Sequence, residues 1–146
     1  MRSRATVEGV ALHRLKRVDD IRGNLLVGEF ERELPFAPAR FFTIFDVPGT
    51  RVRGEHAHRR CKQFLICLSG TCSIVVEDDR NREEIPLDTP DFGAYIPPMI
   101  WMTLYKFSSN ALLLVFASSY YDPDDYIRDY EVYLRSLDNN ALQNDG

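Results

Sequence analysis

The residues best suited to chemistry in this chain are two histidines one residue apart, His56 and His58, in the stretch VRGEHAHRRCKQF at positions 52–64. The chain has three histidines, so a pair at this spacing is its most specific chemical feature. In a β-strand, residues i and i+2 point to the same face, so the two imidazoles would project together. Such a pair can ligate a metal ion, exchange protons with a substrate near neutral pH, or face solvent at the start of a strand.

The residues around the pair argue against a metal ion. The spacing of glycines and histidines resembles the first sequence motif of the cupins, but Gln63 stands where that motif has a glutamate ligand. The segment corresponding to the second motif, FGAYIPPMIWMTLY at 92–105, holds no histidine. A catalytic metal site needs three or four good ligands. We therefore expect no metal and no other cofactor, and we assign His56 and His58 to acid–base catalysis, with nearby Arg53 lowering the pKa of an imidazole by disfavouring its charged form.

Short strands separated by turn residues make up most of the chain and favour an all-β sandwich or barrel. A hairpin is indicated at Ser69-Gly70. The strand-like segments are 23–30, 40–47, 63–70, 71–78, 101–107 and 111–119.

The segment 122–137 predicts a C-terminal helix that packs on the barrel. Asp122 suits the N-cap and Pro123 the first helical position. We expect one domain, with an N-terminal strand at 20–30, a barrel at 34–119 and this helix. One face of the helix would then carry the stripe Tyr126, Ile127, Tyr130, Tyr133, Leu134 and Leu137.

Length and charge restrict the function classes. The chain has 146 residues, which suits one domain, and its net charge of −4 argues against binding to nucleic acid. The longest apolar stretch, ALLLVFA at 111–117, is too short to span a bilayer, and no apolar run that would suit a secretory signal follows the N-terminus. Cys61, Cys67 and Cys72 lack CxxC spacing and are typical of reduced, buried thiols, so we expect a soluble cytoplasmic protein.

Several longer stretches, in chain order, carry a family resemblance from about Leu15 to Leu134. They are DIRGNLLVGE (20–29), LPFAPARFFTIFDV (34–47), RGEHAHRRCKQFLICLSG (53–70), LDTPDFGAYIPPMIW (87–101) and LLLVFASSYYDPDDYIRDYEVY (112–133). Together they make the chain similar to the WxcM-like sugar-nucleotide 3,4-ketoisomerases of the FdtA and QdtA type. This resemblance implies a cupin-type jelly-roll β-barrel or sandwich with a short C-terminal helix.

The resemblance also implies a metal-independent isomerase that acts on a dTDP-4-keto-6-deoxyhexose in deoxysugar biosynthesis for glycans such as O-antigens. The hydrogen at C3 is acidic because it is α to the C4 ketone. One imidazole can remove it to give an enediol intermediate, and a second group can return a proton to C4. His56 and His58 match the family's active-site histidines, and which one is base and which is acid stays open. Family members usually form homodimers, often by exchanging an N-terminal strand, so a homodimer is implied here.

Candidates for binding the substrate come from the same comparison of motifs. Arg22 and Arg40 match arginines of the family and suit bidentate contacts with a pyrophosphate, although each can equally form a surface ion pair. Arg53 and Gln63 flank the histidines and can contact the sugar or orient an imidazole. The aromatic candidates, which would line the pocket or stack on thymine unless they lie in the core, are Tyr95, Trp101 and Tyr105.

This sequence departs from the family pattern at three positions. Phe42 stands where several members have a tyrosine. Met102 and Thr103 stand where many members have a charged or imidazole side chain followed by glutamate. The sugar and the C4 configuration of the product are therefore not transferred from the family. Two other functions stay open: a metal-dependent cupin enzyme such as a dioxygenase, and a non-catalytic module that binds a sugar nucleotide.

Overall fold

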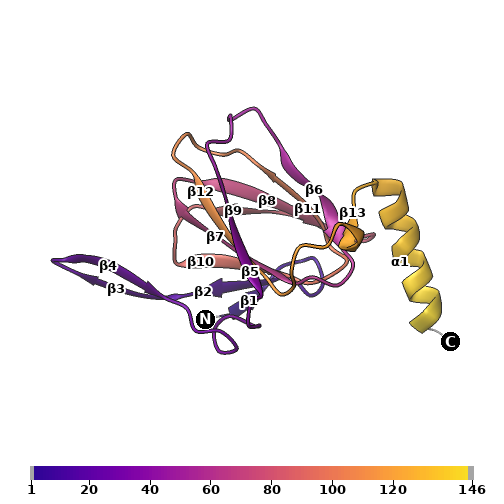
Figure 1. Ribbon diagram of the computed structural model, residues 1–146, viewed down its shortest axis with the longest axis horizontal. Coiled ribbons are helices and arrows are strands. Elements are labelled where there is room, and N and C mark those ends of the chain that lie inside the picture. Colours follow the sequence, from indigo (N-terminus) through magenta and orange to yellow (C-terminus); the bar gives the residue numbers. More distant parts are fainter. Residues whose placement is uncertain (1, 145–146) are drawn as a thin grey trace.

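Two antiparallel β-sheets packed face to face form the body of the protein (Figure 1). The structure is a computed structural model that describes the backbone of residues 2–144 and the side chains as far as residue 139. The six-stranded sheet has the order β1 (Arg2–Arg4), β2 (Ala11–Arg14), β10 (Phe92–Ile96), β7 (Gln63–Ser69), β12 (Leu112–Ala117) and β5 (Arg40–Phe45). The five-stranded sheet has the order β13 (Tyr126–Ile127), β6 (Arg53–His58), β11 (Trp101–Tyr105), β8 (Cys72–Glu77) and β9 (Arg82–Leu87).

The predicted all-β fold is confirmed as a sandwich of two open sheets rather than a closed barrel. The segment predicted as one N-terminal strand is half of a hairpin, in which β3 (Lys16–Asp20) pairs with β4 (Gly23–Val27). This hairpin projects from one end of the sandwich, and the C-terminal helix α1 (Tyr130–Asn144) lies at the other end (Figure 1).

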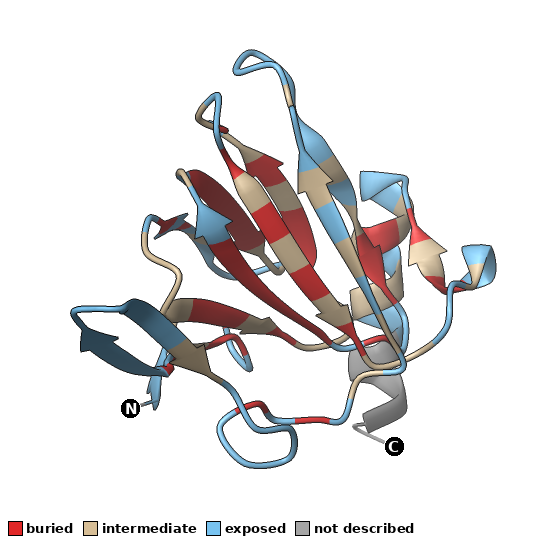
Figure 2. Cartoon of the chain, turned by 60° about the vertical axis from the view of Figure 1, so that its left-hand side comes forward, coloured by how far each residue is buried: buried red, intermediate tan, exposed pale blue. Residues whose placement is uncertain are grey.

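The core lies between the two sheets, where the inward faces of the strands meet (Figure 2). Strand β12 shows the period of two that produces this arrangement, because Leu113, Val115 and Ala117 are buried while the residues between them are half-buried. The three cysteines are buried and unpaired, as their spacing predicted. The most deeply buried side chains of the central core include Leu65, Ile74, Val76, Leu87, Leu113 and Val115.

The C-terminal segment departs from the predicted helix at 122–137. Asp122 does cap a helical turn, with its side chain accepting a hydrogen bond from the Asp124 amide, but that turn is a 3-10 helix that ends at Asp125. Tyr126 and Ile127 then pair with β6, and the α-helix begins only at Tyr130. Tertiary contacts of this segment, described below, override its local helix signals.

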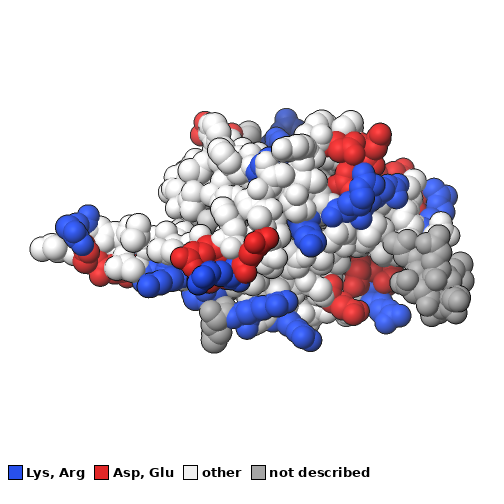
Figure 3. Space-filling model, turned by 60° about the horizontal axis from the view of Figure 1, so that its bottom comes forward, with Lys and Arg blue, Asp and Glu red and all other residues white. Residues whose placement is uncertain are grey.

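Surface charge on the face shown in Figure 3 is mixed, with basic and acidic side chains side by side over the projecting hairpin and the sandwich. This mixture fits the acidic overall balance and gives that face no continuous basic patch of the kind that binds nucleic acid. Among the residues that the structure describes, no helix has the length and apolar character required to cross a bilayer.

Candidate active site

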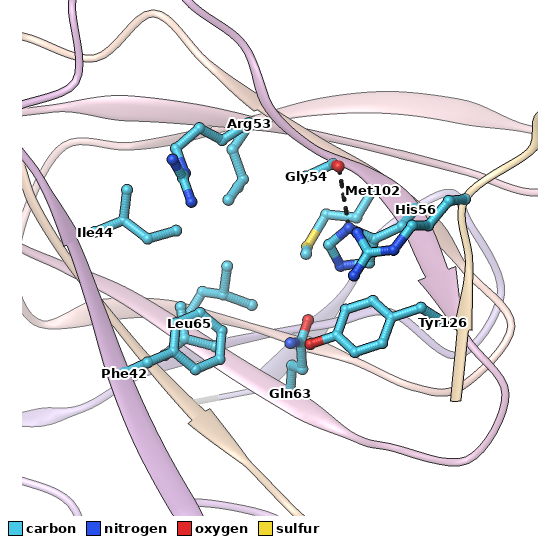
Figure 4. A pocket seen from close by; sticks show the side chains of 12 residues that line it. Phe42, Ile44, Arg53, Gly54, His56, Gln63, Leu65, Met102 and Tyr126 are labelled. Atoms are coloured by element: carbon cyan, nitrogen blue, oxygen red, sulfur yellow. Dashed lines mark hydrogen bonds between the residues drawn. The ribbon is translucent and has the colours of Figure 1, made fainter. Parts of the chain in front are cut away.

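A cavity of about 230 Å³ lies between the sheets and is lined by His56 of the predicted histidine pair, whereas His58 is not among its lining residues. Strand β6 supplies His56, and β5, β7, β11 and β12 supply mainly apolar walls (Figure 4). Of the predicted site residues, the cavity brings together His56, Arg53 and Gln63. The full lining is Phe42, Ile44, Arg53, Gly54, His56, Gln63, Leu65, Met102, Leu104, Val115, Tyr126 and Arg128.

His56 is held by the backbone of its own strand. Gly54 has a φ of +83°, and the chain makes a bulge against β11 at this point. The carbonyl oxygen of Gly54 lies 3.0 Å from Nδ1 of His56 (Figure 4). Because a carbonyl only accepts, Nδ1 carries the proton and donates it, which leaves Nε2 as an unprotonated acceptor.

The pKa of His56 is lowered to about 4. Burial is the largest cause, and repulsion from His58 and Arg128 adds to it, while the hydrogen bond to Gly54 opposes the shift in part. His56 is therefore a neutral imidazole at pH 7, ready to accept a proton.

His58 is buried and bonded to a carboxylate. Its Nδ1 lies 3.0 Å from Oδ2 of Asp125, and the same carboxylate accepts backbone amide hydrogens from Arg60 at 2.7 Å and Cys61 at 3.3 Å. Burial would raise the pKa of Asp125, but the hydrogen bonds from His58 and these amides outweigh it and lower that pKa. Burial lowers the pKa of His58 against the opposing effect of Asp125, so the pair is a carboxylate and a neutral imidazole with its proton on Nδ1.

The two imidazoles and one tyrosine ring form a compact aromatic group. The ring centroids of His56 and His58 are 5.0 Å apart, which places both on the same side of β6 as the strand period predicted. The ring of Tyr126 contacts both, with centroid separations of 4.9 and 4.4 Å. The guanidinium of Arg128 lies 4.3 Å from the Tyr126 ring centroid. Asp125 and Arg128 were not identified from the sequence, because they fall in the segment read as helix, and Tyr126 was expected only in the apolar stripe of that helix.

Three polar atoms near this group have no hydrogen-bond partner in the described structure. They are Nε2 of His58, Oε1 of Gln63 and Nε of Arg40, all buried. Arg40 and Gln63 both pair with Ala117 of the strand between them, so their side chains leave the same face of the sheet on either side of a small residue. The guanidinium of Arg40 also lowers the pKa of His58, which places its charge near that imidazole. Unpaired buried donors and acceptors of this kind are what a polar ligand would satisfy.

The remaining predicted residues lie away from the cavity. Met102 and Leu104 take the inward face of β11, so Trp101 and Tyr105 face outward, where Trp101 packs on α1 against the rings of Tyr130 and Tyr133. This corrects the expectation that Trp101 and Tyr105 line the pocket.

Tyr95 and Arg22 are also placed elsewhere. Tyr95 lies between the inward-facing Ala94 and Ile96, and it packs in an outer cluster against Phe36. Arg22 lies at the tip of the β3–β4 hairpin, 2.7 Å from Asp20 in an exposed ion pair, so it does not reach the cavity of its own chain.

Comparison with known proteins extends these observations. The family model described as FdtA, WxcM-like, C-terminal, matches residues 8–138. The chain is 38% identical over 131 residues to the TDP-4-oxo-6-deoxy-alpha-D-glucose-3,4-oxoisomerase of Aneurinibacillus thermoaerophilus, which covers 90% of this chain and 94% of that protein.

Solved structures give the same picture in three dimensions. QdtA, a sugar 3,4-ketoisomerase from Thermoanaerobacterium thermosaccharolyticum in complex with TDP, aligns with a TM-score of 0.89 and 35% identity over 92% of this chain and 98% of that one. WlaRB, a TDP-quinovose 3,4-ketoisomerase from Campylobacter jejuni, aligns with a TM-score of 0.84 and 40% identity over 88% of this chain and 99% of that one.

Proposed function

The chain belongs to the FdtA, WxcM-like family of sugar-nucleotide 3,4-ketoisomerases, and from this we propose that it isomerises a dTDP-4-keto-6-deoxyhexose by moving the carbonyl group from C4 to C3. The observation that carries the proposal is a pair of neutral imidazoles in contact, of which His56 lines the cavity, each with Nδ1 held by a hydrogen bond.

The reaction needs two proton transfers, one between carbons and one between oxygens. Removal of the C3 proton, which is α to the C4 carbonyl, gives an enediolate. Loss of the O3 proton, protonation of O4 and protonation of C4 then complete the 3-keto isomer. We assign the carbon protons to Nε2 of His56, because His56 lines the cavity. We assign the oxygen protons to His58, whose imidazole Asp125 stabilises when it becomes charged.

The cavity also suits the two ends of such a substrate. Its volume of about 230 Å³ is below the roughly 300 Å³ at which drug-sized ligand pockets begin, so we place the hexose inside it and the nucleotide outside. Phe42, Ile44 and Met102 provide an apolar wall for the C6 methyl group. Arg53 and Arg128 are exposed at the edge of the same cavity, where they can bind the pyrophosphate.

We further propose that the enzyme works as a homodimer in the cytoplasm. The projecting β3–β4 hairpin exposes apolar side chains that a second copy would cover, since Ile21 at its tip is fully exposed and Leu25 is 59% exposed. In such a dimer, Arg22 would be carried toward the other subunit, where it can still contact the substrate. The free, buried cysteines fit a reducing compartment. Light scattering tests the dimer, and Ile21→Lys should give a monomer.

The decisive test of the reaction is proton exchange with solvent. The enzyme is incubated with dTDP-4-keto-6-deoxyglucose in deuterated water with a chelator, and the ring protons are followed by NMR. We expect exchange at C3 and deuterium at C4 of the product. His56→Asn should reduce the rate by about 100-fold or more. His13→Gln is the matched control, because the ring of His13 packs on Phe64 away from the cavity.

The outcomes separate the open alternatives. Normal binding of the sugar nucleotide without exchange would support a binding module, and activity that disappears with the chelator would support a metal-dependent enzyme. Full activity in both His56→Asn and His58→Asn would refute the catalytic assignment.

A further inference from the structure

Next to the cavity, three potential metal ligands from two stretches of the chain meet in the interior. They are the imidazole of His58, the thiol of Cys61 and the carboxylate of Asp125, each no more than 5% exposed. One ligand atom from each lies within 4.8 Å of the others. The Cys61 amide donates to Oδ2 of Asp125, so the loop that carries the thiol is already tied to the carboxylate.

We propose that these three side chains form an inhibitory binding site for Zn²⁺. Thiolate, imidazole and carboxylate together are a ligand set that Zn²⁺ prefers, whereas Mg²⁺ and Ca²⁺ prefer oxygen alone. The charges also balance, because a thiolate and a carboxylate neutralise a divalent cation, and a neutral assembly is the form that a buried site tolerates.

The geometry requires only modest movements of the three side chains. Zinc bonds of about 2.0–2.3 Å place tetrahedral ligand atoms roughly 3.3–3.8 Å apart. The His58 Nδ1 to Asp125 Oδ2 distance of 3.0 Å would widen slightly, and rotation of the Cys61 side chain can shorten separations that now reach at most 4.8 Å. The fourth position falls to water or to the hydroxyl of Ser118, whose Oγ lies 3.9 Å from Cys61 Sγ.

The inhibitory effect follows from which atom the metal would take. Zinc would bind the lone pair of His58 Nδ1, so the neutral imidazole would have to carry its proton on Nε2. With a proton already on Nε2, His58 could no longer accept one from the substrate. This consequence rests on the proposed function, but metal binding itself does not. The site also differs from a cupin metal centre built on both histidines, because His56 has no part in it.

Cobalt binding to the chelator-treated full-length protein tests the site directly. Co²⁺ bound by a thiolate gives a charge-transfer absorption band, which we expect in the wild type. Cys61→Ser should abolish the band. It should also weaken Zn²⁺ binding by more than about 10-fold, because even the loss of a residue that only orients a metal ligand weakens binding by about 10- to 100-fold. Cys67→Ser and Cys72→Ser are matched controls, because these buried thiols lie at the far end of β7 and the start of β8, and both should keep the band.

The second measurement is inhibition of turnover. Zn²⁺ should inhibit the wild type and the two control variants, while Cys61→Ser should retain its basal rate and resist Zn²⁺; Cys61→Ala serves if the serine variant does not fold. Absence of a thiolate band in the wild type, its persistence without Cys61, or its loss in a control variant would overturn the proposal. Since the band needs no turnover, failure of the proposed isomerase activity leaves this test intact.

Discussion

Replacing Asp125 by asparagine should disable His58 while nearly preserving its shape. The carboxylate accepts three hydrogens, at 2.7 Å from the Arg60 amide, 3.0 Å from His58 and 3.3 Å from the Cys61 amide. An asparagine side chain has one oxygen that can accept hydrogen bonds, and we expect it to accept the short hydrogen bond from the Arg60 amide. The NH₂ group then faces Nδ1 of His58, which must give up its proton and accept, so the proton moves to Nε2.

The expected loss of rate follows from this change of tautomer. Nε2 can no longer accept a proton from the substrate, and the imidazolium loses its neighbouring negative charge. General acid–base catalysis contributes about 10²- to 10⁴-fold, so kcat should fall within that range while KM changes little. The Cys61 amide is left without an acceptor in the interior, which should lower the free energy of unfolding by about 1–3 kcal/mol.

Three measurements on Asp125→Asn check this reasoning. Steady-state kinetics give kcat and KM, thermal unfolding gives the stability, and ¹⁵N NMR of the imidazoles reports which nitrogen of His58 carries the proton. A variant with the proton on Nε2 and an unchanged kcat would refute the role assigned to His58. A variant that keeps the proton on Nδ1 would refute the account of the hydrogen bonds.

Four further predictions test the rest of the site. Because His56 must be neutral to act as a base and its pKa is lowered to about 4, kcat/KM should lose the His56 contribution only as the pH falls through about 4, and a loss centred near 6.5 would contradict this. In the unfolded chain His56 is protonated below pH 6.5, whereas in the folded chain it is protonated only below about pH 4. The contribution of His56 to the free energy of unfolding is therefore complete above pH 6.5 and decreases as the pH falls from 6.5 to about 4. The melting temperature of His56→Asn should depend less on pH in this range, and an unchanged dependence would contradict this. Gly54→Ala places a Cβ 3.0 Å from the Met102 carbonyl oxygen at a φ of +83°, so it should destabilise by about 1–3 kcal/mol and lower kcat by displacing the carbonyl that orients His56; unchanged melting and kinetics would contradict this. Arg128→Gln should raise KM about tenfold, because it removes a charged contact with phosphate worth roughly 1.4 kcal/mol. Unchanged binding of TDP to this variant would contradict the assignment.

Local periodicity was sufficient to predict the histidine pair but not the walls around it. His56 and His58 share a face because a strand repeats every two residues. The same rule could not say which face of β11 turns inward, because WMTLY is apolar on both sides. In the structure Met102 and Leu104 line the cavity. Trp101 packs against the C-terminal helix, and the hydroxyl of Tyr133 accepts the backbone amide hydrogen of Trp101.

The C-terminal part of the site could not be predicted because its conformation depends on distant contacts. From the sequence, Asp125 falls in the first turn of the predicted helix at 122–137. Asp122 and Pro123 do begin a helical turn, but it is a 3-10 helix that ends at Asp125. Its partner His58 lies more than sixty residues earlier in the chain. Tyr126 and Ile127, which follow Asp125, pair with the strand that carries His58 and so form a short strand in place of a helix. Nothing in the local sequence distinguishes an acid that favours a helix dipole from one that binds a histidine.

The position of β13 along the chain has a consequence for synthesis. The strands that supply the other walls of the cavity have been synthesised once Ala117 is added, whereas Asp125, Tyr126 and Arg128 follow. Since domains fold from the N-terminus as they are made, a nascent sandwich can close before its acid–base pair is complete. His58 acquires its carboxylate, and both imidazoles acquire the Tyr126 ring, only when the segment of β13 adds to the edge of β6. An interrupted translation product would therefore be compact but inactive.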